Sequence, residues 1–250
     1  MSIDVGITTI TCLVLLSICI LIRTQLKSII KSIKENNNED QTTSTFTTCT
    51  ECMHEGVHIE SDKLVNDFKK VTGFNQAAVC ITDNAIANCD NTIGSAAVTT
   101  GKYSLAYTNG TSSAAICTGY ESAAIADNHD TVALSVGDKS TSKANKRSAL
   151  AICYGSFSNA VASSPITTAI IAGSYSTAVA SCKNSIAISM GYKNKIKGAL
   201  GSWLIYADIN YDDYSEHVNV KSIKIVYVDG FKIKADTYYT VENGKFVEAT

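Results

Sequence analysis

Six glycines recur at an interval of eighteen residues through the middle of this 250-residue chain: Gly101, Gly119, Gly137, Gly155, Gly173 and Gly191. The residue four before each glycine is alanine, and the residue three before it is aliphatic. The residue three after it is serine in five copies and Asn194 in the sixth. A fixed period of this kind indicates one structural unit repeated in space. Because such units stack on their neighbours, the chain is predicted to form an elongated solenoid.

Each copy contains two short segments in which small residues alternate with larger ones. Before one glycine the small residues are Ser113, Ala115 and Cys117, and after another they are Ser158 and Ala160. Alternation with a period of two places the small residues on one face of a strand. We therefore predict a mainly β fold over residues 76–200, a parallel β-roll of 18-residue coils with two strands each, with residues 76–87 as an incomplete first coil. Glycine, Asn and Asp are expected to supply the backbone angles of the corners.

An aliphatic column accompanies the alanines, and we call it the outer aliphatic column: Val98, Ile116, Leu134, Ile152, Ile170 and Ile188. If the alanines face inward, these side chains face outward in one line. Each would gain about 1.5–3 kcal/mol by leaving water, and an exposed stripe of this size favours association. We expect identical chains to shelter it around a symmetry axis. The alternative is that the C-terminal segment of the same chain covers it.

The N-terminal region reads as a membrane anchor followed by a linker. Residues 5–22 are uncharged and just long enough to span a bilayer. We predict a single-pass transmembrane anchor and short helix over 1–34 and a polar linker over 35–60; a buried helix in a bundle is the alternative for the apolar run. Four basic residues follow the span: Arg23, Lys27, Lys31 and Lys34. By the positive-inside rule they predict that the bulk of the chain lies in the cytoplasm.

Two further segments flank the repeats. Ser61 has the position of an N-cap, Gly73 that of a stop, and apolar residues lie between them at helical spacing, so a capping helix is predicted over 61–75. The C-terminal segment 201–250 is predicted to be a small β-hairpin domain. Asp229-Gly230 and Asn243-Gly244 are expected to form its two-residue turns.

Few residues suggest chemistry. One cluster contains residue types that bind zinc: Cys49, Cys52, His54 and His58. Its spacing is too tight for the usual zinc finger. The alternatives are that these are plain loop residues, or that the two cysteines form a redox pair or an inter-chain disulfide. Most of the nine cysteines are expected to be reduced and structural. His129, beside Asp130, is a candidate catalytic histidine without a recognisable partner. No catalytic residue, metal or cofactor is therefore predicted. The net charge of −2 argues against a nucleic-acid partner.

The segments 185–191, SIAISMG, and 114–124, AAICTGYESAA, resemble the head repeats of trimeric autotransporter adhesins. The resemblance covers about residues 76–200. It implies a left-handed parallel β-roll, a homotrimer formed through the outer aliphatic column, and binding to a host surface or matrix. The repeat here is longer than in that family, and neither a long coiled-coil stalk nor a C-terminal membrane barrel follows. Similar rolls occur in phage tail and fibre proteins.

Together these features predict a non-enzymatic structural or adhesive surface protein that presents a trimeric β-roll head. A phage or virion fibre or tail component is the alternative. Aromatic residues beside the glycines are candidates for the binding patch or for mutual stacking: Tyr103, Tyr120, Phe157, Tyr175 and Tyr192. A hexapeptide-type acyltransferase would place an aliphatic residue every six positions, but counting from Ile116 gives Ser122 and Asn128. Adhesion needs the roll outside the cell and the basic flank predicts it inside, so the sequence leaves the side of the membrane open.

Overall fold

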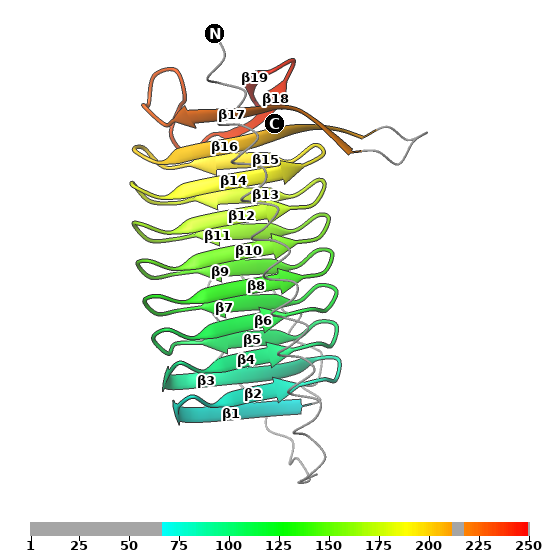
Figure 1. Cartoon of the computed structure of the whole chain (residues 1–250), viewed down its shortest axis with the longest axis vertical. Helices are drawn as coiled ribbons and strands as arrows, with labels where there is room; N and C mark the ends of the chain where they lie inside the picture. The colour runs from blue at the N-terminus through cyan, green and yellow to red at the C-terminus, as the bar shows by residue number, and fades with distance from the viewer. Residues whose placement is uncertain (1–66, 212–217, 250) are drawn as a thin grey trace. The chain divides into compact units, whose positions relative to one another are not determined.

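The computed structural model describes residues 67–211 and 218–249, which form a parallel β-solenoid (Figure 1). The predicted anchor, the linker and the cluster from Cys49 to His58 lie outside the described residues. No helix in the described part of the chain is long and apolar enough to cross a membrane.

Within residues 67–211 and 218–249, nineteen strands make two sheets. The ten-stranded sheet has this order: β1 (Asp67–Phe74), β3 (Ala85–Ile93), β5 (Leu105–Thr108), β7 (Ala123–Ala126), β9 (Thr141–Ala144), β11 (Asn159–Ala162), β13 (Thr177–Ala180), β15 (Lys195–Gly198), β18 (Tyr238–Glu242) and β19 (Lys245–Glu248). The nine-stranded sheet has this order: β17 (Val218–Tyr227), β16 (Trp203–Tyr211), β14 (Ile186–Gly191), β12 (Thr168–Ala172), β10 (Leu150–Tyr154), β8 (Val132–Val136), β6 (Ala114–Cys117), β4 (Ala96–Thr99) and β2 (Ala77–Cys80).

Neighbouring strands pair at the repeat interval. Ala151 lies beside Ala133 on one side and Ala169 on the other, and Ile152 lies beside Leu134 and Ile170. Strands β1 to β16 alternate between the two sheets, two to a turn, which makes eight turns. The predicted solenoid of 18-residue, two-strand coils is thus confirmed, and the segment expected to be an incomplete first coil contributes the regular strand β2. Since the described coils have two sides, the three-sided prism of a hexapeptide acyltransferase does not fit them.

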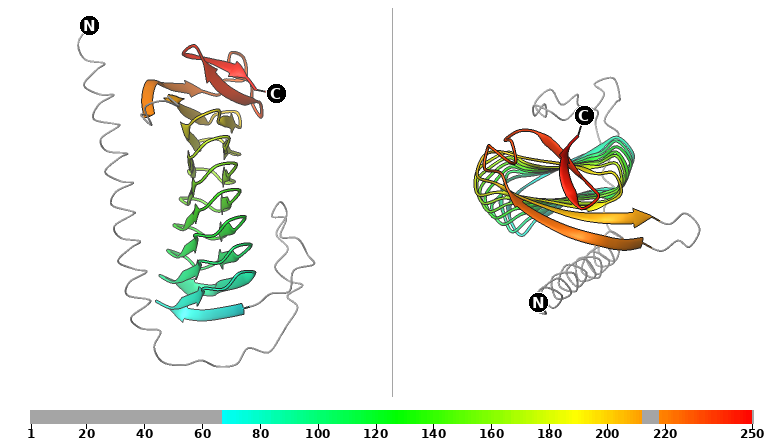
Figure 2. Two further views of the ribbon diagram at one scale, coloured as in Figure 1. Left: turned by 90° about the vertical axis from the view of Figure 1, so that its right-hand side faces the viewer. Right: turned by 90° about the horizontal axis from the view of Figure 1, so that it is seen from above.

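The two sheets of the solenoid lie close together (Figure 2). Small side chains fill the space between them. Ala115, Ala133, Ala151 and Ala169 are fully buried in one column, and the alanines of the opposite sheet face them. Larger side chains enter the interior at Ile171 in β12 and again at the C-terminal end, where Ile196 and Leu204 are fully buried. Alanine brings the two sheets close together, so most of the larger aliphatic residues of the coils face outward.

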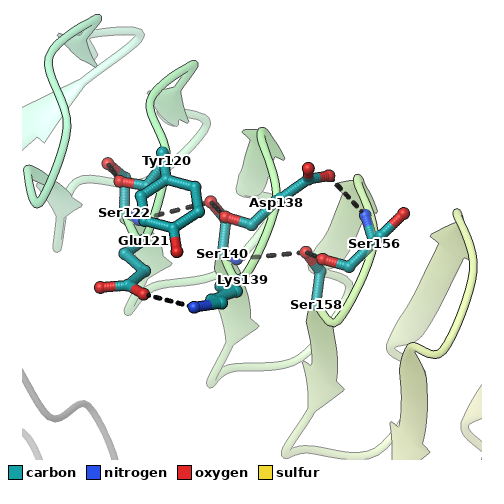
Figure 3. Close-up of polar contacts among 8 residues, drawn as sticks. All are labelled: Tyr120, Glu121, Ser122, Asp138, Lys139, Ser140, Ser156 and Ser158. Atoms are coloured by element: carbon teal, nitrogen blue, oxygen red, sulfur yellow. Dashed lines mark hydrogen bonds and ion pairs between the residues drawn. The ribbon is translucent and has the colours of Figure 1, made fainter.

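A buried serine ladder holds one corner of every coil at a fixed spacing. The Ser140 hydroxyl accepts the Ser122 N–H at 3.3 Å and donates to the Gly119 carbonyl at 3.0 Å. The same pair of bonds recurs from coil to coil, since the Ser158 hydroxyl accepts the Ser140 N–H and donates to the Gly137 carbonyl. Figure 3 shows the serine-to-serine bonds of this ladder for Ser122, Ser140 and Ser158. In the last copy the amide oxygen of Asn194 accepts the Ser176 N–H at 2.8 Å. Asparagine therefore replaces serine as the acceptor in this ladder.

The repeat glycines are required by space, and the expectation that they supply the corner angles is wrong for Gly101 to Gly173. A Cβ added to Gly137 would lie 2.2 Å from the Gly119 carbonyl oxygen, and the same clash occurs in every copy. The left-handed corner position falls two residues later, with φ of 56° at Tyr103 and 57° at Phe157. Glycine thus admits the carbonyl of the preceding coil.

The N-terminal cap differs from the prediction. Residues 67–74 form strand β1, which pairs in parallel with β3, so the capping helix expected over 61–75 is wrong for its described part. Val71 packs against the inner cluster, whereas Phe68 is exposed. Pairing with the open edge of β3 satisfies backbone groups that a helix would leave without partners, and this outweighs the local helical pattern.

The C-terminal segment extends both sheets and does not cover the outer aliphatic column. Strand β17 pairs antiparallel with β16, and β18 with β15. Asn243-Gly244 forms the predicted two-residue turn between β18 and β19. Asp229-Gly230 instead begins a longer loop, in which the Asp229 carboxylate accepts the N–H groups of Phe231, Lys232 and Ile233. These bonds stabilise the charged form and hold the pKa of Asp229 below its ordinary value.

Five cysteines lie in the described residues and all are free thiols. Four of them are buried, which confirms for this part of the chain that the cysteines are reduced and structural: Cys80, Cys89, Cys117 and Cys153. Burial raises the pKa of Cys117 to about 12 and that of Cys153 to about 11. The thiols therefore stay protonated and act as small apolar residues of the core.

Replacing Gly137 by alanine tests the close approach of successive corners. Because the new Cβ meets backbone rather than a mobile side chain, we expect a loss of about 3 kcal/mol in the free energy of unfolding, measured by urea denaturation. Asn159→Ala, an exposed position one coil further on, is the control and should change stability by less than about 0.5 kcal/mol. Equal stabilities of the two variants would contradict the steric role of the glycine.

Candidate interaction face

The outer aliphatic column lies on the outer face of the nine-stranded sheet. Its members pair in register, Val98 with Ile116, and Ile152 with Ile170. The alanines beside them are fully buried on the inner face, so alternation directs the column outward. Val98, Ile116 and Leu134 are 4%, 9% and 6% exposed. Ile152, Ile170 and Ile188 are half-buried, so the C-terminal half of the column is the half that remains open.

Both ends of the outer aliphatic column continue beyond the six predicted residues. Val79 precedes Val98 in register, while Ile205 and then Ile225 follow Ile188. A second column runs parallel to it and is apolar except at Thr168: Val132, Leu150, Thr168, Ile186, Trp203 and Tyr227. Sequence reasoning missed this second column, although the apolar residues five before three of the glycines are a signal for it. The open face is thus wider and longer than a single stripe.

Large apolar side chains are exposed around the C-terminal half of this face. Trp203 is 45%, Ile225 60% and Tyr227 47% exposed. The Trp203 and Tyr227 rings contact each other with centroids 5.1 Å apart. Tyr154, at the opposite margin of the same face, is 63% exposed. Exposed apolar groups gathered in this way mark an interaction surface more often than chance exposure does.

The aromatic residues beside the glycines stack on one another along the corner. Phe157 and Tyr175 are parallel with centroids 5.2 Å apart, and Tyr192 meets Tyr175 edge-on at 5.9 Å. In the earlier coils the Lys139 ammonium lies 5.1 Å from the centre of the Tyr120 ring and 3.1 Å from the Glu121 carboxylate (Figure 3). Hydrogen bonds with the Tyr120 side chain and with the Glu121 carboxylate raise the pKa of Lys139 above its ordinary value. The corner column therefore combines exposed aromatic and charged groups.

The remaining candidates for chemistry are separated from one another. His129 is exposed in the opposite corner. Its backbone N–H donates to the Asn128 side chain, and its backbone carbonyl accepts the Ser112 N–H. The buried hydroxyl groups of the serine ladder are bonded to backbone groups of the preceding coil. In residues 67–211 and 218–249, no three His, Cys, Asp or Glu side chains gather as a metal site would require.

These features define a class, a flat parallel β-solenoid with one extended apolar outer face. No protein-family model, curated protein or solved structure matches the chain. The functional argument therefore rests on the geometry of the faces and corners.

Ile166 provides a test of the backbone strain at the left-handed corner position. Ile166, 50% exposed, has a φ of 58°, a region that disfavours β-branched residues. We expect Ile166→Asn to raise the free energy of unfolding by about 1 kcal/mol, measured by urea denaturation. Asn184 occupies the equivalent position one coil later with a φ of 59°, so Asn184→Ile should lower it by a similar amount. A lower free energy of unfolding for Ile166→Asn, or a higher one for Asn184→Ile, would contradict the assignment of strain.

Proposed function

We propose that the protein is a non-enzymatic structural protein whose solenoid forms the head of a homotrimer, assembled through the outer face of the nine-stranded sheet. The observation that carries this proposal is the in-register apolar face, half-buried to exposed from β10 to β17. A second copy offers a ladder of the same spacing, so every coil of one chain meets the equivalent coil of the next. A three-fold axis parallel to the solenoid keeps that match along the whole face.

The energetics favour a contact over many coils. A fully buried aliphatic side chain gains about 1.5–3 kcal/mol relative to water, and a half-buried one has about half of this still to gain. Association costs about 4–15 kcal/mol in lost translational and rotational freedom. Three isoleucines alone would barely offset that cost. The additional apolar residues of the second column, with Trp203 and Tyr227 at its end, supply the remainder.

The trimer is the form in which the corners become a repeated outer surface. With the apolar face sheltered, the aromatic and charged corner column is displayed three times along a rigid rod. This arrangement suits adhesion to a host surface or matrix, the role that the resemblance to adhesin heads implies. The apolar run at residues 5–22 would anchor the assembly to a membrane with the solenoid outside.

The oligomeric state tests the proposal directly. We expect the full chain in mild detergent to have a mass, by light scattering, that is a multiple of three chains. Ile170→Lys should abolish trimer formation, because three ammonium groups would be buried around the axis. Thr177→Lys is the matched control, since it lies in the next strand of the ten-stranded sheet, where its partner one coil later is already Lys195. A monomeric wild type, or a trimeric Ile170→Lys variant, would refute assembly through this face.

Labelling of intact cells tests the location. Lys102 and Lys183 are exposed on the two corners. If the solenoid lies outside, an impermeant amine reagent should modify both lysines on intact cells that produce the full chain, as found by mass spectrometry. Cells lysed before labelling provide the reference level. Modification only after lysis would place the solenoid in the cytoplasm and remove the adhesive part of the proposal.

A further inference from the structure

Four strands form the open edges of the two sheets: β1, β19, β2 and β17. An open edge pairs readily with another strand unless charge, brevity or a bulge prevents it. In β1, two adjacent lysines block the edge, and Lys70 forms an ion pair with Asp90 at 2.7 Å. Strands β2 and β19 have four residues each, whereas β17 has ten. The edge of β17 is therefore the least protected of the four.

The accessible part of β17 is its second half. The register with β16 shifts between Val220 and Ser222, so Lys221 is the bulged residue, and residues 222–227 pair regularly. This segment, SIKIVY, is rich in strand-forming residues and contains one charged side chain, Lys224. The Lys224 side chain lies against Gly244 of the neighbouring turn. Residues 222–227 pair with residues 203–208, which pair in turn with β14, and β17 is the last strand of its sheet, so the far edge of this segment is open. Viewed along the solenoid, the other ends of β16 and β17 extend beyond the outline of the coils (Figure 2).

Unpaired charges accompany this edge. Lys221, Lys224, Asp208 and Glu242 line an open pocket of about 580 Å³ beside β17. Within the described residues, none of these four side chains forms an ion pair. The hydroxyl oxygen of Ser222, in the same pocket, is buried without a hydrogen-bond partner. The pocket of one chain thus contains two ammonium groups and two carboxylates. When a second copy is related to the first by a two-fold axis, the ammonium groups of each copy can face the carboxylates of the other.

We propose that β17 is a second assembly site, at which the β17 strand of another copy pairs antiparallel about a two-fold axis. The joint makes one continuous sheet of the two nine-stranded sheets and links the solenoids end to end. Ile225 and Tyr227 of the two copies then lie together on the outer face. The lysines of each pocket approach the carboxylates of the other. This inference goes beyond the proposed trimer, because it uses a strand edge and a different symmetry axis.

Two proline variants test the edge in the full chain in mild detergent. Consecutive N–H groups of a strand point to opposite edges. One of the two variants, Lys224→Pro or Ile225→Pro, therefore loses a backbone hydrogen bond to β16, and the other loses only an N–H group at the open edge. The open-edge variant is the one that keeps the melting temperature of the wild type, because proline is tolerated at such a position. We expect it to halve the mass measured by light scattering, from six chains to three. Lys232→Ala, which removes an exposed lysine of the loop after β17 that takes no part in the proposed joint, is the control and should keep six.

The outcomes separate this inference from the trimer. If the edge pairs but the trimer does not form, the wild type has two chains and the open-edge variant has one. If the trimer forms without edge pairing, both have three, and the inference is overturned. Hydrogen exchange provides a second measurement if both prolines lower the melting temperature. The alternate amides of residues 222–227 that point to the open edge should exchange at least tenfold faster on dilution to the three-chain form, and rates independent of concentration at these amides would also overturn the inference.

Discussion

The close contact between successive corners is the constraint on which the rest of the solenoid depends. Each repeat glycine leaves room for the carbonyl of the preceding coil, and each buried serine bonds both to that carbonyl and to the N–H of the preceding serine. Buried backbone groups are costly unless paired, so this ladder satisfies the corner while it sets the distance between coils. The strand register, and with it every column of side chains, follows from this spacing.

A narrow interior determines what remains for function. Since alanine, serine and cysteine occupy most of the space between the sheets, most isoleucines and the corner aromatic residues of the coils have no place inside, and Ile171 and Ile196 are the exceptions in the described strands β12 and β15. They form continuous columns on the outside, where a monomer gains little from them. The small inner residues that make the core thin therefore also leave a long apolar face on the outside, which is suited to association with copies of the chain.

The ends of the solenoid follow different rules from its middle. In the middle, each strand has two neighbours of the same sequence type, and local pattern and register agree. At the N-terminal end, the helical spacing of apolar residues competes with the open edge of β3, and the edge prevails. At the C-terminal end, Asp229 bonds three successive N–H groups and begins a loop where a tight turn was expected. An edge that needs a partner is a non-local demand, so local sequence reasoning fails at these positions.

The sequence by itself determined the repeat length, the two strands in each coil, the inward alanines and the outward column from Val98 to Ile188, because strict periodicity leaves few ways to pair identical units. It also identified the corner aromatics. Only the tertiary structure decided that the glycines serve close approach, that β1 is a strand, and that the apolar face widens to include Trp203 and Tyr227. These depend on which backbone edges and side chains meet across coils far apart in the chain, and no single repeat contains that information.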